Sequence, residues 1–251
     1  MTTAAPPRLL LVAHGTRSAE GRAAVEALRD AVVAASPDGV DVALAWVDLL
    51  DPSPEDVLAD GVTTVVVPCF LGAGYHVRHD VTTAVAGAPG HAVMTPHLGE
   101  GIERVLLERL REAGPAPDAV VLAAAGSRDP DSRAETRALA GRLAARLGVP
   151  VEAAFASAAE PSVPAAVAAA REAGHRRVTA LSLLLAPGVF ADRVAECGAD
   201  VVTGPFTGRS TGSGELVRMI LERYVTAIPG VECGGMRADN QGDMREKEIG
   251  G

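Results

Sequence analysis

The stretch LLLVAHGTR, Leu9–Arg17, returns later in the chain as VVLAAAGSR, Val120–Arg128. Each copy is a run of apolar residues that leads to a glycine, a hydroxyl residue and an arginine, which is typical of a buried parallel strand followed by a turn. His14 of the first copy has become Ala125 in the second. Such an internal repeat indicates two structural units of the same kind.

The similarity continues beyond this strand. Asp51-Pro52-Ser53 corresponds to Glu160-Pro161-Ser162, and Val62–His76 corresponds to Val178–Phe190. A second histidine, His76, is therefore also lost from the second copy. Both copies must meet the same folding demands, so a polar residue that only one of them keeps points to chemistry and not to folding.

Each copy alternates short β-rich apolar runs with longer helical stretches, which is the pattern of βα units on a parallel sheet. The clearest helix is Ala19–Ala35, with Ser18 as its N-cap, and a further helix is expected over Val77–Ala86. We predict an α/β fold of two tandem flavodoxin-like lobes, each built on a parallel sheet, with an active-site cleft between them.

The repeat also sets the expected domain boundaries. Residues 1–114 form an N-terminal lobe that carries the candidate chemistry, and residues 118–228 form a degenerate repeat lobe. The two are joined by Gly114-Pro115-Ala116-Pro117. Residues 229–251 have no apolar period, which predicts a disordered tail.

The composition restricts the partners and the compartment. The chain has 251 residues, 48% of them hydrophobic, and a net charge of −9, which disfavours nucleic acids and anionic membrane surfaces. No apolar run approaches the ~20 residues that span a bilayer, and the start of the chain does not resemble a signal peptide. We expect a cytoplasmic protein. The cysteines Cys69, Cys197 and Cys233 are too widely spaced for a zinc or iron–sulfur motif and too few for a disulfide framework.

Several common enzyme classes are excluded by missing motifs. The only lysine is Lys247, so the chain has no phosphate-binding P-loop lysine and no lysine for a Schiff base in either repeat. No G-x-S-x-G elbow is present, and no G-x-G-x-x-G follows the first strand. Because His14, His76 and Asp48 are expected at one strand edge, metal chemistry without a nucleotide becomes the leading class.

Three polar residues are expected at one edge of the first sheet. Ligands of open parallel sheets bind beyond the carboxyl ends of the strands. His14 ends the first strand, Asp48 follows the second, and His76 follows the third after a glycine-rich loop. Their counterparts in the second copy are Ala125, Ser157 and Phe190. The repeat has kept the scaffold and lost this set of groups.

Each candidate also has a structural interpretation. His14 could hydrogen-bond to a turn, and Asp48 could cap one. His79 lies three residues after His76 and therefore near the same helix face, where it would be a metal ligand, a supporting residue or a solvated side chain. His97, which precedes a helix, is a minor candidate.

The residues at this edge resemble a known family. His14-Gly15-Thr16-Arg17, the segment WVDLLDP at residues 46–52 and VVVPCFLGAGYHVRHD at Val65–Asp80 resemble the sirohydrochlorin chelatases, the class II chelatases of cobalamin and siroheme synthesis. The resemblance covers most of the first copy, and a fainter echo runs through the second. Long bacterial members of this family are built in the same way from a tandem duplication.

The resemblance implies ATP-independent insertion of Fe²⁺ or Co²⁺ into sirohydrochlorin, with no permanently bound cofactor. It assigns His14 and His76 as catalytic, metal-binding histidines. Asp48 is a third catalytic candidate, although the family often has the longer glutamate there. The residues expected to contact the tetrapyrrole are Gly15, Thr16, Arg17, Arg78 and His79.

Two alternative functions are compatible with the same residues. One is a non-catalytic cytoplasmic protein that binds metal or tetrapyrrole, and the other is a protoporphyrin ferrochelatase. The choice between iron and cobalt is open, because imidazole and carboxylate ligands suit both ions. A monomer is expected, because the two fused lobes already form the two-lobed arrangement that a single-lobe relative would form by dimerising.

Overall fold

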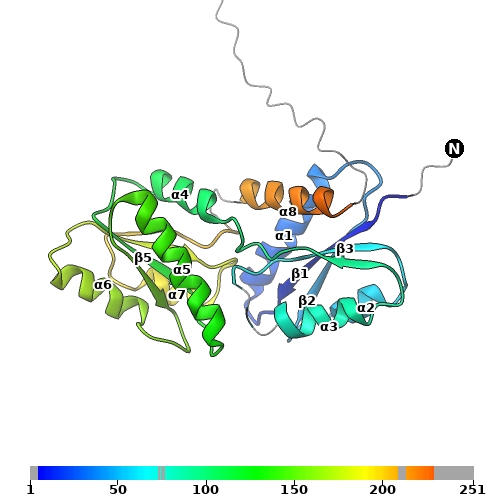
Figure 1. Cartoon of the computed structure of the whole chain (residues 1–251), viewed down its shortest axis with the longest axis horizontal. Coiled ribbons are helices and arrows are strands. Elements are labelled where there is room, and N and C mark those ends of the chain that lie inside the picture. Colours follow the sequence, from blue (N-terminus) through cyan, green and yellow to red (C-terminus); the bar gives the residue numbers. More distant parts are fainter. Residues whose placement is uncertain (1–4, 73, 75–76, 209–212, 229–251) are drawn as a thin grey trace, which may run out of the picture.

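The computed structural model of the chain describes residues 5–72, 74, 77–208 and 213–228 (Figure 1). It confirms the expected α/β architecture of two four-stranded parallel sheets, ordered β2-β1-β3-β4 and β6-β5-β7-β8. The strands of the first sheet are β1 (Arg8–His14), β2 (Val42–Val47), β3 (Thr64–Pro68) and β4 (Ala92–Met94). Those of the second are β5 (Ala119–Ala124), β6 (Val151–Phe155), β7 (Val178–Leu183) and β8 (Val201–Val202).

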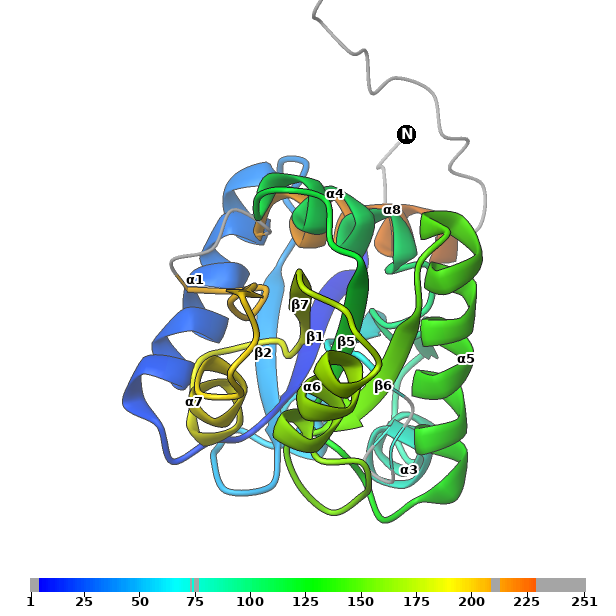
Figure 2. The same ribbon diagram turned by 90° about the vertical axis from the view of Figure 1, so that its left-hand side faces the viewer.

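Helices cover both faces of each sheet, as Figure 2 shows for the second one. They are α1 (Ala19–Ala35), α2 (Pro54–Leu58), α3 (Thr82–Ala86), α4 (Glu103–Glu112), α5 (Pro130–Leu147), α6 (Val163–Glu172), α7 (Val189–Ala195) and α8 (Ser213–Ala227). The predicted cap of α1 is confirmed, because the Ser18 hydroxyl accepts a hydrogen bond from the amide of Gly21. The expected helix Val77–Ala86 is instead a π-helical turn, η1 (Val77–Val81), followed by α3.

The strands bury both of their faces, which explains why they are almost wholly apolar. Alternate residues of β1 point to opposite sides of the sheet. Leu9 and Leu11 belong to a large core that also contains Val120 and Leu122 of β5, so this core is shared by both halves of the chain. Leu10 belongs to a smaller core on the other side of the first sheet.

The two halves exchange their last helices. Helix α8 packs on α1 and β3 of the first half, while α4 packs on α5 of the second (Figure 1). The Tyr224 hydroxyl of α8 donates to the carbonyl of Pro7 at 2.7 Å, and the Arg109 side chain of α4 donates to the carbonyl of Pro205 and stacks on Phe206. The boundary expected at residues 114–118 therefore separates the sequence repeats but not the packing units.

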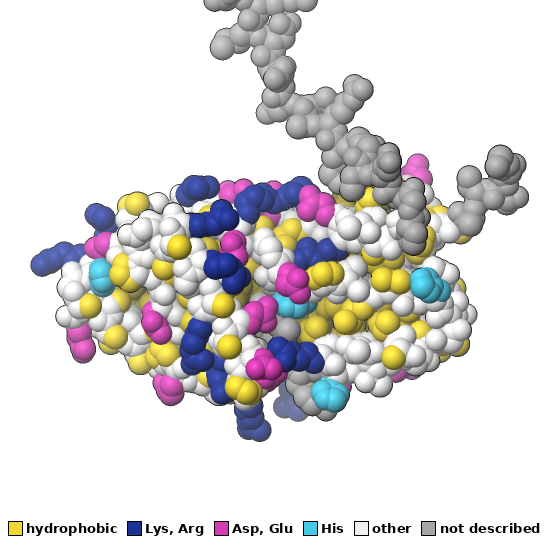
Figure 3. Space-filling view, viewed as in Figure 1, with side chains coloured by type: hydrophobic (Ala, Val, Ile, Leu, Met, Phe, Trp, Pro, Cys, Tyr) yellow, Lys and Arg dark blue, Asp and Glu magenta, His cyan; other side chains and the backbone are white. Residues whose placement is uncertain are grey.

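We call the first sheet with α1, α2, α3 and α8 the first lobe, and the second sheet with α4, α5, α6 and α7 the second lobe. Charged side chains gather along the junction of the two lobes (Figure 3). Among them, Arg104 of α4 pairs with Glu215 of α8 at 2.7 Å, and Arg142 of α5 pairs with Glu103 of α4. The junction thus combines a shared apolar core with exposed ion pairs. The core contributes most of the stabilisation, because exposed ion pairs add little.

Truncating the α8 side chain Ile220, which is fully buried in the shared core, tests the helix exchange. Ile220→Ala should lower the free energy of unfolding by about 2–5 kcal/mol, and Ile220→Val by only about 0.5–1.5 kcal/mol, because the residual cavity is smaller. Urea denaturation followed by circular dichroism measures both values. An unchanged midpoint for Ile220→Ala would contradict the packing of α8 in this core.

Candidate active site

The carboxyl ends of β1 and β2 bring His14 and Asp48 to one edge of the first sheet. His14 is the last residue of β1 and pairs in register with Val47, the last residue of β2. The His14 ring is exposed, and its Nδ1 lies 2.7 Å from the carbonyl oxygen of Gly15. A carbonyl oxygen only accepts, so Nδ1 is the donor and the lone pair of the neutral ring is on Nε2. The turn contact considered in the sequence analysis is therefore present, and it fixes the tautomer.

Gly15 packs directly on the backbone of Asp48. Its amide donates to the carbonyl of Val47 at 2.9 Å, and a Cβ at this position would lie 2.0 Å from the carbonyl oxygen of Asp48. The second lobe repeats the feature, since a Cβ on Gly126 would lie 1.9 Å from the carbonyl oxygen of Ser157. Ser157 is thus the structural counterpart of Asp48, as the sequence repeat predicts. Gly15 is buried, and packing explains this glycine in both lobes.

Asp48 lies in an unusual backbone conformation. Asp48 and Leu49 have φ values of 64° and 63°, in the left-handed region that non-glycine residues seldom occupy. Both side chains are exposed. Strained residues of this kind are often held in place at functional sites, and an aspartate tolerates the conformation better than most residues.

His76 lies outside the described residues, and so do Ala73 and Tyr75. The described residues that flank this segment are Gly72 and Val77. Downstream, the chain forms the π-helical turn η1, and the hydroxyl of Thr82, the first residue of α3, donates to the carbonyl of Val77 at 3.0 Å. Single π-helical turns are frequent at functional sites, and a helical sequence pattern does not distinguish them from α-helix.

The other expected substrate-binding residues occupy different environments. Thr16 is half-buried, and its hydroxyl accepts from the amide of Ser18 at 3.1 Å, while the Arg17 side chain is exposed. His79 is exposed on η1. Arg78 does not simply face solvent, because its Nη1 lies 2.8 Å from an oxygen of Asp131 in the second lobe. This hydrogen bond is the main cause of a raised pKa of the Arg78 guanidinium, and Asp129 and Glu135 add to it.

Cys69 follows β3 close to this edge, but its thiol is not a ligand candidate. The side chain is fully buried, and desolvation raises its pKa to about 12. Metal binding requires the thiolate, which burial in an apolar core strongly disfavours. Cys197 is likewise buried in the second lobe. Both are core thiols, and Cys233 lies outside the described residues.

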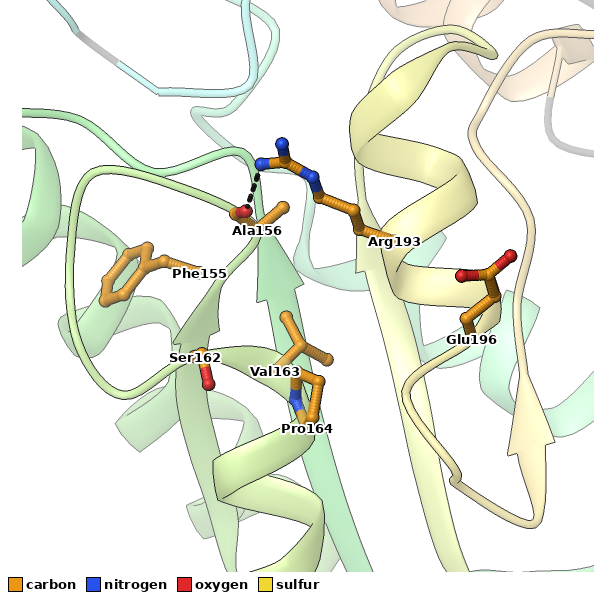
Figure 4. Close-up of a pocket in the computed structure, with 7 residues that line it drawn as sticks. All are labelled: Phe155, Ala156, Ser162, Val163, Pro164, Arg193 and Glu196. Carbon is orange, nitrogen blue, oxygen red and sulfur yellow. Dashed lines mark hydrogen bonds between the residues drawn. The ribbon is translucent and has the colours of Figure 1, made fainter.

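The corresponding edge of the second lobe has different chemistry. Ala125, Ser157 and Phe190 stand where the first lobe has His14, Asp48 and His76. A cavity of about 370 Å³ lies beside this edge, between β6, α6 and α7 (Figure 4). Arg193 of α7 reaches across it and donates to the carbonyl of Ala156 at 3.0 Å. Val189 and Phe190 expose large apolar side chains at the start of α7.

Sequence reasoning missed the residues of the second lobe that contact the flanks of the His76 segment. Asp131 binds Arg78, and Glu135 lies 3.2 Å from Nε2 of His97, a histidine that is only 5% exposed. The sequence signal that was available is in α5, which carries Asp131 and Glu135 four positions apart. The corresponding positions of α1 are Glu20 and Ala24, so only one of them is acidic there. Within the described part of the chain, no three His, Cys, Asp or Glu side chains converge as a metal-binding group.

Substitution of the two equivalent glycines tests the close packing at the sheet edges. Gly15→Ala and Gly126→Ala should each lower the free energy of unfolding by about 1–3 kcal/mol, because the added methyl group overlaps a backbone oxygen. Gly126→Ala should cost more, since Gly126 also has φ of 94°. Thermal melts of the two variants give the order, and a neutral Gly126→Ala would contradict the turn geometry.

Comparisons with known proteins agree with this architecture. The family model CbiX matches residues 8–113 and 119–201, one segment in each repeat. No curated protein matches the chain significantly by sequence. None of the described helices has the length and apolar character needed to cross a bilayer.

Solved structures share the fold. SirB from Bacillus subtilis with Fe³⁺ has a TM-score of 0.67 at 18% identity, covering 88% of this chain and 96% of that one. The sirohydrochlorin chelatase SirB from Bacillus subtilis subspecies spizizenii in complex with cobalt gives 0.63 at 18% identity, covering 87% and 94%. CbiX, the terminal enzyme for biosynthesis of siroheme in denitrifying bacteria, gives 0.63 at 21% identity, covering 88% and 99%. With both repeats matched by the family model and the fold matched over most of its length, the chain belongs to the CbiX family.

Proposed function

We propose that this protein inserts a divalent metal ion, Fe²⁺ or Co²⁺, into sirohydrochlorin without ATP, in siroheme or cobalamin biosynthesis. The observation that carries the proposal is the match of the CbiX model to both repeats. It is supported by the confinement of His14 and His76 to the first repeat. Neither of the alternatives, a non-catalytic carrier or a protoporphyrin ferrochelatase, has a comparable observation in its favour.

The reaction makes specific demands on the protein. A divalent ion must lose water, be held over the macrocycle and replace the pyrrolic protons. Neutral imidazole suits both tasks, because it is a borderline ligand for first-row divalent metals and its ordinary pKa of about 6.5 lets it accept a proton near neutral pH.

His14 is arranged for one of these tasks. Its Nδ1–H donates to the carbonyl of Gly15, which orients the ring and leaves the lone pair on Nε2. We assign Nε2 of His14 as the atom that binds the incoming metal or accepts a pyrrolic proton. His76 is the partner for the other role. Asp48, adjacent to Gly15 at the same edge, completes the ligand set or orients an imidazole.

The substrate presents an apolar ring with carboxylate arms. Arg17 and Thr16, next to His14, are our candidates for binding these arms, with His79 on η1. Arg78 is a weaker candidate than the sequence indicated, because Asp131 already engages its guanidinium. Exposed Leu49 of the first lobe, with Val189 and Phe190 of the second, offers apolar surface for the ring. The shared core and exchanged helices favour a monomer as the working unit.

Replacing each histidine tests the catalytic assignment. His14→Ala and His76→Ala should each reduce the rate of metal insertion by about 100-fold or more, because a ligand or proton acceptor is lost. Absorbance spectroscopy of the tetrapyrrole under anaerobic conditions measures the rate. The matched control is His91→Ala, an exposed histidine just before β4, which should keep the wild-type rate. Full activity of His76→Ala would remove that residue from the site.

A comparison of substrates tests the function itself. The wild-type protein should turn over sirohydrochlorin with Fe²⁺ or Co²⁺ many times per site, without added ATP, and should act poorly on protoporphyrin, which has fewer carboxylate arms. Steady-state rates for each ion and each tetrapyrrole give the answer. Metal uptake that stops at one ion per protein, without turnover of tetrapyrrole, would indicate a carrier. A preference for protoporphyrin over sirohydrochlorin would indicate a protoporphyrin ferrochelatase.

A further inference from the structure

The strand edge of the second lobe adjoins the strand edge that carries His14. The loop after β7 meets the first turn of α1, where the carbonyl oxygen of Pro187 occupies space that a side chain on Gly21 would need. On the other side of the junction, Asp131 of α5 binds Arg78 of η1. Because the turn after β1 leads into α1, a ligand the size of a tetrapyrrole held over His14 also reaches the second edge.

The side chain of Arg193 on α7 is held at this second edge. Its Nη1 donates to the carbonyl of Ala156, the residue after β6, at 3.0 Å, and its guanidinium carbon lies 5.8 Å from the centre of the Phe190 ring. The hydrogen bond uses a single N–H of the guanidinium, which has several more. Across the described part of the chain no carboxylate pairs with it, although α7 carries Asp192 and ends at Glu196. Arg193 thus keeps donors for an anion.

The guanidinium borders the cavity of about 370 Å³ between β6, α6 and α7. Figure 4 shows the Arg193 side chain extending from α7 toward Ala156, whereas Glu196 stays on the α7 side. An acetate or propionate arm suits this space, because its methylene groups would contact apolar walls while its carboxylate meets the guanidinium. Besides Arg193, the lining residues are Phe155, Ala156, Ser162, Val163, Pro164 and Glu196.

The internal repeat shows that the fold does not require an arginine at this position. By strand register, Arg193 corresponds to His79, and Asp192 corresponds to Arg78. The positive charge therefore sits one position later in the second copy than in the first. In the first copy Asp131 pairs with the arginine, whereas in the second no described carboxylate does. An ion pair explains the first arginine, and the second has no such structural explanation.

We propose that Arg193 binds a carboxylate arm of the substrate, so that the second lobe helps to select carboxylate-rich tetrapyrroles. The inference rests on the proposed function for the identity of that substrate. A chain with a net charge of −9 repels an anionic ligand overall, so the arms need local cations. Arg17 offers one cation beside His14, and Arg193 offers another across the junction. Val189 and Phe190, exposed at the start of α7, would contact the ring beside that arm.

Arg193→Gln tests the proposal, because glutamine keeps an amide donor for Ala156 and removes the charge. We expect Kd for metal-free sirohydrochlorin to rise about tenfold, since a hydrogen bond to a charged group is lost. For protoporphyrin, which has fewer carboxylate arms, the rise should be much smaller. Arg193→Lys keeps the charge without the planar pair of donors and should give an intermediate Kd. Fluorescence titration of each tetrapyrrole measures these values.

Turnover gives a second readout that a merely structural role would not produce. In Arg193→Gln, KM for sirohydrochlorin should rise while kcat at saturating substrate changes little, because the arm lies away from the reacting atoms. The thermal midpoint should stay close to that of the wild type, because the substituted side chain is exposed.

Arg171→Gln is the matched control. Arg171 is an exposed arginine of the same lobe that also donates to a backbone carbonyl, that of Gly198, at 2.9 Å. It lies near the C-terminus of α6 and pairs with Asp200, which precedes β8, so it is at the opposite ends of the strands. This variant should keep the wild-type Kd for sirohydrochlorin.

Three results would overturn the proposal: an unchanged Kd for sirohydrochlorin in Arg193→Gln, an equal rise for protoporphyrin, or an equal rise in Arg171→Gln. Binding is measured without metal, so it separates this proposal from the proposed function. A wild-type protein that binds sirohydrochlorin and inserts no metal would overturn the proposed function alone. A wild-type protein that does not bind sirohydrochlorin would overturn both.

Discussion

The parallel pairing of β1 with β2 and β3 is the constraint on which the candidate site depends. Because all three strands run in the same direction, their carboxyl ends open at one edge, and residues far apart in sequence meet there. Gly15 tightens the arrangement, since only a glycine lets the turn after β1 approach the carbonyl of Asp48. Without this close approach, His14 and Asp48 would belong to separate loops.

The second constraint is the exchange of α4 and α8. Helix α8 packs on α1 and β3, helix α4 packs on α5, and apolar residues of both helices belong to one core with the two sheets. The lobes are therefore held at a defined separation by buried surface and not by their exposed ion pairs alone. The contact of Arg78 in the first lobe with Asp131 of α5 crosses this junction.

Much of the fold could be predicted from the sequence, because apolar periodicity and caps are local signals. The strands, Ser18 as a cap and the match of Ser157 to Asp48 follow from the repeat, and the structure confirms them. The helix exchange could not be predicted, because α4 and α8 have the same amphipathic pattern and either sheet satisfies it. The π-helical turn η1 looks helical in sequence. The contact of Glu135 with His97 could not be predicted, because the two residues are far apart in sequence.

The exchanged helices also explain why a repeat that has lost its histidines persists. A shortened gene that encoded only the first copy would leave the inner face of its sheet without α8, exposing Leu9, Leu11 and Val65 to water. The second copy is thus needed to cover the first sheet, whatever its catalytic worth. Substitutions at its strand ends do not uncover this core, so Ala125 and Ser157 can stand there in place of His14 and Asp48 on the same backbone framework.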